Sequence, residues 1–258
     1  MLPEQPSTLT SVRSDKRIAL RALGRRRQEA DLRDWDRDWD QSYHHVGDYH
    51  EGRYDHQEVS PYSKTTRDVD SPVFLLLQDW SSDEMLSKDF NEDVARRGLT
   101  PGLRTNTRLE KLPREVFGRD LTEVYGTNLF PFVKPGPISS PIPFAHLVRA
   151  AKEFAVPQVE IVRPKLVVCL GVGTYRAVAV ALGLPRCQDL HRAIHSAPIY
   201  IGEAQVRQRE RQQLAPVREV RGPRLPAPFC HLQQDNPAIC RCPQRSSRRA
   251  IARRHAAA

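Results

Sequence analysis

The chain has 258 residues, enough for one α/β domain of ordinary size with extensions. Hydrophobic residues make up 39% of it and prolines number 21, so some segments should lie outside a packed core. No apolar stretch is long enough to span a bilayer, and the first residues lack the apolar centre of a secretory signal. We therefore expect a soluble cytoplasmic protein.

The net charge of +9 is concentrated at the end of the chain. Residues 205–258 contain twelve arginines, no lysine and three acidic residues, while the rest carries 28 basic and 28 acidic residues. The global charge therefore does not indicate nucleic-acid binding by the main part of the chain. A local basic groove remains open as an alternative, with the candidates Arg104, Arg108, Lys134 and Lys165.

Residues 1–60 are expected to form a polar N-terminal extension. Within it, the spacing predicts a solvated helix over 17–39, with Leu20, Leu23 and Leu32 as a thin apolar stripe. A patch of histidines and aspartates follows, but its spacing fits no metal motif and favours a solvated loop. The patch consists of His44, His45, His50, His56, Asp48 and Asp55.

Residues 61–204 have the pattern of an α/β domain. Apolar runs predict strands at 73–77, 124–128 and 165–170. Between and after them, helices are predicted at 83–97, 106–117 (despite Pro113), 143–154, 156–162 and 174–182. The fold class is α/β: a three-layer α/β/α arrangement around a short, mostly parallel sheet of about four strands, the fourth beginning near Ile199.

Each of the three predicted strands stops at residues able to contact a ligand. The first runs into Gln78 and Asp79, the second into Asn128, and the third into Gly171. Ligand sites in open α/β sheets lie beyond the carboxyl ends of parallel strands. These residues should therefore meet at one edge of the sheet, although Asp79 could instead cap the following helix and Asn128 a turn.

Together the three segments resemble the uracil-DNA glycosylase superfamily, over roughly residues 60 to 200. Gln78-Asp79 matches the family's water-activating motif, and Asn128 stands where the family has its uracil-reading asparagine. The segment from Arg163-Pro164-Lys165 to Gly171 is similar to the family's third strand. The resemblance implies base-excision repair of DNA that contains uracil, by a monomer that needs no cofactor and no metal.

The resemblance also implies residue roles. Asp79 would be catalytic, orienting the attacking water and stabilising positive charge on the sugar of a flipped-out nucleotide. Asn128 offers a donor and an acceptor to the pairing edge of uracil. Gln78, Trp80 and Ser81 would line the same substrate pocket.

Two departures from the family pattern affect these expectations. Trp80 and Ser81 replace a proline and a bulky aromatic residue after Gln-Asp, so exclusion of thymine is open. No cysteine precedes Cys169, so the ligand count excludes the family's iron–sulfur cluster. A zinc site at Cys230, His231, Cys240 and Cys242 is also rejected, because the spacing is poor.

The DNA-contact candidates are Lys134, Gly171 and His195. The family places a histidine after a fourth strand, whereas His195 precedes the segment where that strand would begin. Residues 205–258 form an Arg/Pro-rich tail that is expected to be disordered, and its composition is typical of a GC-rich gene read out of frame. Loss of the family's histidine after the fourth strand would impair activity.

Two other functions remain open. A non-catalytic DNA-binding relative would use the Arg-rich tail for phosphate contacts. A nucleotide-cofactor domain would use Gly171-Val172-Gly173 at a helix start, although Arg176 stands where a third glycine is required.

Overall fold

The computed structural model describes residues 8–184 and residue 189. They form an α/β fold with one three-stranded sheet, in which every strand pair is parallel and the strand order is β2-β1-β3. The strands are β1 (Val73–Leu77), β2 (Tyr125–Asn128) and β3 (Leu166–Cys169). The predicted fourth strand near Ile199 lies outside the described residues, and so does His195.

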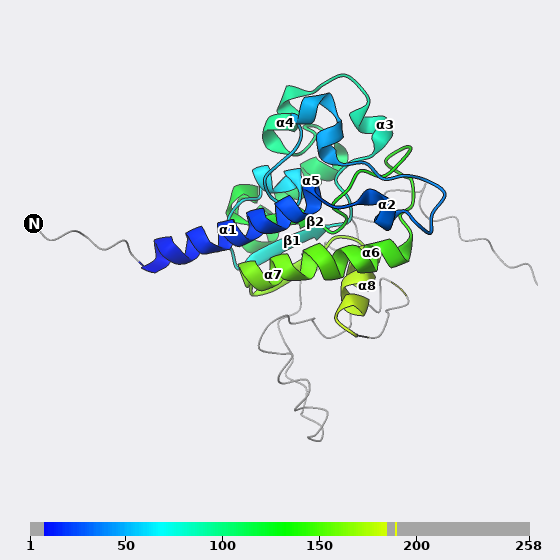
Figure 1. Cartoon of the computed structure of the whole chain (residues 1–258). Coiled ribbons are helices and arrows are strands. Elements are labelled where there is room, and N and C mark those ends of the chain that lie inside the picture. Colours follow the sequence, from blue (N-terminus) through cyan, green and yellow to red (C-terminus); the bar gives the residue numbers. More distant parts are fainter. Residues whose placement is uncertain (1–7, 185–188, 190–258) are drawn as a thin grey trace, which may run out of the picture. The chain divides into compact units, whose positions relative to one another are not determined.

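Helices connect and cover these strands (Figure 1). The α-helices are α1 (Thr8–Gln28), α2 (Leu32–Trp35), α3 (Asp83–Leu86), α4 (Glu92–Arg97), α5 (Arg104–Phe117), α6 (Phe144–Ala150), α7 (Val156–Val162) and α8 (Val172–Ala181). The short helical turns are η1 (Val46–Asp48), η2 (His50–Gly52), η3 (Pro61–Lys64), η4 (Leu121–Glu123) and the π-turn η5 (Ala151–Ala155). None of the helices in the described part is long and apolar enough to cross a membrane.

The strands were predicted to within one or two residues, but the helix expected over 83–97 is two helices. α3 ends at Leu86, and α4 restarts after Asn91, whose side chain accepts the Val94 N–H at 3.0 Å. The amide side chain thus satisfies one of the unpaired donors at a new helix start. α5 continues through Pro113, which is buried together with Leu109 and Leu112.

The segment predicted as a polar extension packs into the main core. Leu20, Trp35, Tyr43 and Val59 are all buried there, against residues of β1, β2 and the α6–η5–α7 helix. The predicted helix over 17–39 is also interrupted, because α1 ends at Gln28 and α2 is a separate turn. α1 therefore packs through Leu20 and the fully buried Arg27, whereas Arg21 and Arg25 stay exposed.

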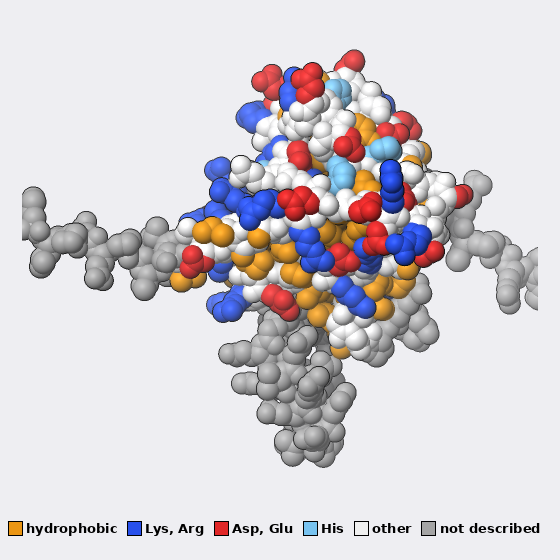
Figure 2. All heavy atoms as spheres, in the orientation of Figure 1, with side chains coloured by type: hydrophobic (Ala, Val, Ile, Leu, Met, Phe, Trp, Pro, Cys, Tyr) orange, Lys and Arg blue, Asp and Glu red, His pale blue; other side chains and the backbone are white. Residues whose placement is uncertain are grey.

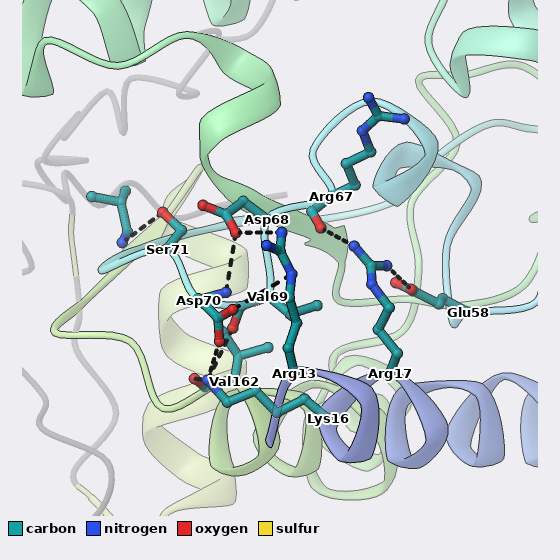
Figure 3. Close-up of polar contacts among 11 residues, drawn as sticks. Arg13, Lys16, Arg17, Glu58, Arg67, Asp68, Val69, Asp70, Ser71 and Val162 are labelled. Atoms are coloured by element: carbon teal, nitrogen blue, oxygen red, sulfur yellow. Dashed lines mark hydrogen bonds and ion pairs between the residues drawn. The ribbon is translucent and has the colours of Figure 1, made fainter. Parts of the chain in front are cut away.

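Side chains of α1 bind the segment that leads into β1 (Figure 3). Lys16 donates to the carbonyl oxygens of Val69 and Val162 at 3.2 and 3.1 Å and pairs with Asp70 at 2.9 Å. Arg17 donates to the Arg67 carbonyl at 2.8 Å. Because Val162 ends α7, Lys16 also satisfies a free carbonyl at that helix end. These contacts lie at the amino ends of the strands.

A proline explains the π-turn between α6 and α7. Pro157 has no N–H, and its ring crowds the carbonyl of Glu153 four residues earlier, so the regular hydrogen-bond ladder cannot continue. Arg26 of α1 donates to that carbonyl at 3.4 Å and to the Glu153 carboxylate at 2.9 Å. The helix therefore stays continuous from Phe144 to Val162 and keeps one face on the sheet.

Candidate active site at the carboxyl edge of the sheet

The strand register brings the predicted site residues to one edge of the sheet, as expected. Leu77 of β1 is opposite Asn128 of β2, and Leu76 is opposite Cys169 of β3. The pairing extends further, since the Leu129 and Phe130 N–H groups donate to the Leu77 and Gln78 carbonyls, both at 2.7 Å. Asp79 therefore follows directly on the last paired residue of the central strand.

The chains that leave β1 and β2 separate after this point and then meet again. Ser82 pairs with Lys134 in an isolated parallel bridge, and the Asp83 N–H donates to the Lys134 carbonyl at 2.8 Å. On its other side, Val133 pairs with His44 through hydrogen bonds of 3.1 and 2.9 Å. The backbone at Lys134 is thus fixed from both sides, close to Asp79.

Lys134 forms a buried ion pair with Asp79. Its ammonium lies 2.8 Å from Asp79 Oδ2, and the two side chains are 3% and 12% exposed. The ammonium also donates to the Ile138 carbonyl. Lys134 was predicted as a DNA contact, and in this structure its ammonium is buried and paired with the carboxylate. Lys165 precedes β3 and thus lies at the opposite end of the sheet, so the two lysines do not share a groove.

Asp79 does not cap the following helix. α3 begins at Asp83 with Ser82 as its N-terminal cap residue, three positions beyond Asp79. The other carboxylate oxygen of Asp79 accepts from Gln78 Nε2 at 3.3 Å. Each carboxylate oxygen has two lone pairs, so both keep acceptor capacity for a water or a substrate group.

Gln78 is packed against the start of α8. A Cβ added to Gly173 would stand 2.9 Å from Gln78 Oε1. The absence of a side chain at Gly173 therefore makes room for the Gln78 carboxamide. This gives Gly173 a packing reason and weakens the nucleotide-cofactor alternative, in which the same glycine would admit a phosphate. Gly171 has φ 101°, a conformation that favours glycine, and it lies at the exposed turn into α8.

Asn128 is 1% exposed and ends β2. Its Oδ1 accepts the Ser60 hydroxyl proton at 2.6 Å, whereas its Nδ2 has no hydrogen-bond partner within the described part of the chain. A buried donor without a partner costs about 1–3 kcal/mol. This arrangement suits a residue that donates to a ligand. The sequence pattern does not indicate this contact, because the two residues are 68 positions apart.

Trp80 and Ser81 are directed into packing. The Trp80 indole N–H donates to the Gly98 carbonyl at 2.7 Å, and its ring packs against a second cluster that includes Tyr54 and Val133. Ser81 is 9% exposed. Tyr49 supports the same loop by donating to Asp83 at 2.8 Å. Burial raises the pKa of the Tyr49 phenol, and the Asp83 carboxylate raises it further, so the phenol stays protonated.

Other polar features of the described residues do not form a competing site. The histidine patch holds no group of metal-ligating side chains, and none is present elsewhere among residues 8–184. A hollow of about 410 Å³ between α1, α2 and α6 is lined by ion-paired residues such as Arg26, Arg149 and Glu153. On the face shown in Figure 2, lysine and arginine side chains lie among acidic ones over much of the surface.

Comparison with known protein families, with curated proteins and with solved structures gave no match for this chain.

Proposed function

We propose that the chain is a DNA base-excision glycosylase of the uracil-DNA glycosylase type, which hydrolyses the N-glycosidic bond of uracil. The observation that supports this most is the β1–β2 register, which sets a carboxylate and a buried amide at adjacent strand ends. The proposal implies a three-layer α/β/α domain with a fourth strand beside β3, whose Leu166 is 41% exposed.

Asp79 is the proposed catalytic residue. In glycosidic cleavage the sugar acquires positive charge as the base leaves, and a carboxylate at that place stabilises it and orients the attacking water. Lys134 keeps the carboxylate in position through its 2.8 Å contact. Gln78 and Asn128 line the proposed base pocket. Trp80 supports the loop from a distance, because its indole packs on the cluster around Tyr54. DNA containing uracil is the proposed partner.

A non-catalytic DNA-binding relative is the second candidate. It is favoured by the same ion pair, because a buried ammonium at 2.8 Å compensates the Asp79 charge and competes with a developing sugar cation. The two candidates differ only in whether Asp79 acts on a bound nucleotide.

The experiment is an excision assay on an end-labelled oligonucleotide with a single uracil, followed by alkali to break abasic sites. A duplex with thymine opposite guanine tests base preference. Asp79→Asn should abolish excision and retain DNA binding, while Asp89→Asn, an exposed carboxylate on the same segment, should leave both unchanged. Excision that survives Asp79→Asn overturns the assigned role. DNA binding without excision by the folded wild type favours the second candidate, and absence of both activities contradicts the two proposals.

A further inference from the structure

One turn of the N-terminal segment has an unusual backbone conformation. His50 and Glu51 have φ values of 48° and 57°, in the left-handed region that residues other than glycine rarely adopt, and Gly52 follows with φ 77°. The His50 ring donates through Nε2 to the Leu86 carbonyl at 2.8 Å. The Gly52 N–H donates to the Tyr49 carbonyl at 3.0 Å. Such strain persists only where the surrounding structure imposes it, and it is concentrated at ligand sites.

The turn determines the position of the Arg53 guanidinium. Arg53 Nε donates to the His50 carbonyl at 3.3 Å, and the guanidinium carbon lies 3.6 Å from the centre of the Phe90 ring. The Phe90 ring in turn packs on Tyr54, with 5.1 Å between the ring centroids. The Tyr54 hydroxyl accepts the Asn91 N–H at 2.8 Å. One face and the Nε edge of an exposed guanidinium are therefore fixed by cation–π stacking and by a hydrogen bond.

The two terminal nitrogens of Arg53 keep their donor capacity. Within residues 8–184, Nε makes the hydrogen bond of this side chain and no carboxylate pairs with it. Arg96 differs, because it is paired with Asp93 at 2.5 Å. A guanidinium with a fixed plane and two free Nη groups matches two oxygens of a phosphate group, to which it can donate in parallel.

Arg53 and Phe90 line a hollow next to the candidate site. The hollow has a volume of about 750 Å³, and its lining consists of Arg53, Phe90, Glu92, Ala95 and Arg96. The Tyr54 ring that supports Phe90 also lies 6.0 Å from the Trp80 ring, between centroids. Because Trp80 directly follows Asp79, the hollow adjoins the loop that carries the proposed catalytic carboxylate.

We propose that Arg53, stacked on Phe90, binds a phosphate group of the DNA strand beside the nucleotide that is excised. This rests on the proposed function and adds a residue that contacts the backbone of the substrate. Because the stack and the Nε hydrogen bond already restrict the side chain, it loses little conformational freedom when the phosphate binds. Glu92 lines the same hollow and repels an anion, so its removal should have the opposite effect to the removal of Arg53.

The salt dependence of DNA binding tests the proposal. Fluorescence anisotropy of a labelled oligonucleotide without uracil measures the association constant of the full chain between about 50 and 200 mM salt. Each neutralised phosphate contributes about 0.7–0.9 to the slope of log K against log salt concentration. Arg53→Ala should lower the slope by that amount and weaken binding about 10-fold. Glu92→Gln should tighten binding about two- to fivefold.

Three further variants separate the geometry of the site from its charge. Arg53→Lys should weaken binding and keep the slope, because the charge remains and the planar fork is lost. Phe90→Leu should do the same, since it removes the stacking surface and leaves Arg53 charged. Arg25→Ala is the matched control, an exposed arginine of α1 that has no ion pair in the described part of the chain, and it should leave the slope unchanged.

The outcomes distinguish this inference from the proposed function. A slope that falls in Arg53→Ala and not in Arg25→Ala supports the inference, whether or not the chain excises uracil. Excision by the wild type with equal slopes in all three proteins overturns the inference alone, and so does an equal fall in both variants. A ¹⁵N signal of Arg53 Nε that shifts with inorganic phosphate and not with DNA assigns the hollow to a small anion and overturns it as well. If the folded wild type binds no DNA at any salt concentration, the inference and the proposed function are both overturned.

Discussion

The Lys134 ammonium and the Asp79 carboxylate lie 2.8 Å apart in a place where both side chains are almost excluded from water. Asp79 follows β1 and Lys134 follows β2, so the ion pair joins the two loops that leave these neighbouring strands. Taking two charges out of water is costly, and it is compensated here by their mutual contact and by the Ile138 carbonyl.

Removing either member of this pair should therefore destabilise the fold. Lys134→Met leaves the Asp79 charge without its partner, and we expect the free energy of unfolding to fall by about 3–5 kcal/mol. Asp79→Asn should also lower the free energy of unfolding, but by less, because the asparagine oxygen can still accept a hydrogen bond from the Lys134 ammonium. Urea unfolding followed by circular dichroism measures both changes.

The double variant Asp79→Asn with Lys134→Met is the decisive comparison. If the pair acts as a unit, the double variant is less destabilised than the sum of the two single variants, by about 0.5–3 kcal/mol. Strictly additive effects would show that the two charges do not interact in solution. The double variant should also remain inactive on uracil, which separates the loss of the catalytic group from the loss of stability.

Gly24 in α1 tests how that helix is seated. A Cβ at this position would stand 1.9 Å from the Gln57 carbonyl oxygen, which belongs to a backbone that cannot easily move. A glycine to alanine change inside a helix normally gains about 1 kcal/mol, but overpacking here should reverse the sign and cost about 1–3 kcal/mol. Thermal and urea unfolding of Gly24→Ala measure this. Arg25→Ala, at the exposed neighbouring position, should change the stability by no more than about 0.5 kcal/mol.

Gly173 offers a contrasting case at the candidate site. There the nearest atom to an added Cβ is the end of the flexible Gln78 side chain, at 2.9 Å. Gly173→Ala should therefore change the stability by less than about 1 kcal/mol, since the helical gain offsets the displacement of Gln78. Excision of uracil should nevertheless fall, as it should in Gln78→Ala. Unchanged excision in both variants would show that Gln78 does not contribute to binding the base.

The strands and their common edge could be predicted because both depend on local patterns. The apolar run of β1 and the abrupt change to Gln78 and Asp79 are visible in the sequence, and parallel pairing then brings Asn128 alongside. The break between α3 and α4 also had a local signal, since Asn91 followed by acidic residues is a common helix start.

The contacts of Ser60 and Lys134, and those of Lys16 and Arg17 in α1, could not be predicted in the same way. Ser60 and Asn128 are 68 residues apart, and only the folded chain joins them. Lysine is usually a surface residue. Here the backbone is held by one bridge at Val133 and one at Lys134, and the ammonium is buried. The sequence likewise indicates solvated charges at Lys16 and Arg17, and only the folded chain brings the carbonyls of Val69 and Arg67 into hydrogen-bond distance of them.

Glu58 gives a prediction about pH. The residue is 4% exposed, and burial raises the pKa of its carboxyl from the ordinary 4.5, an effect that Tyr125 and Arg17 reduce but do not cancel. The Tyr125 hydroxyl donates to it at 3.0 Å, and Arg17 lies 3.4 Å away. Because the folded state holds this proton more tightly than the unfolded state, the carboxyl contributes stability that is fully present below pH 4.5 and is lost as the pH rises through the folded-state pKa.

Glu58→Gln removes this titration and keeps an oxygen that can accept from Tyr125. The stability of the variant relative to the wild type should therefore increase as the pH rises from about 4 to about 7, by about 1.4 kcal/mol for each unit of the pKa difference between the folded and unfolded states. Urea unfolding of both proteins across this range measures the difference. A constant difference between Glu58→Gln and the wild type would mean that Arg17 and Tyr125 offset the burial of Glu58 completely.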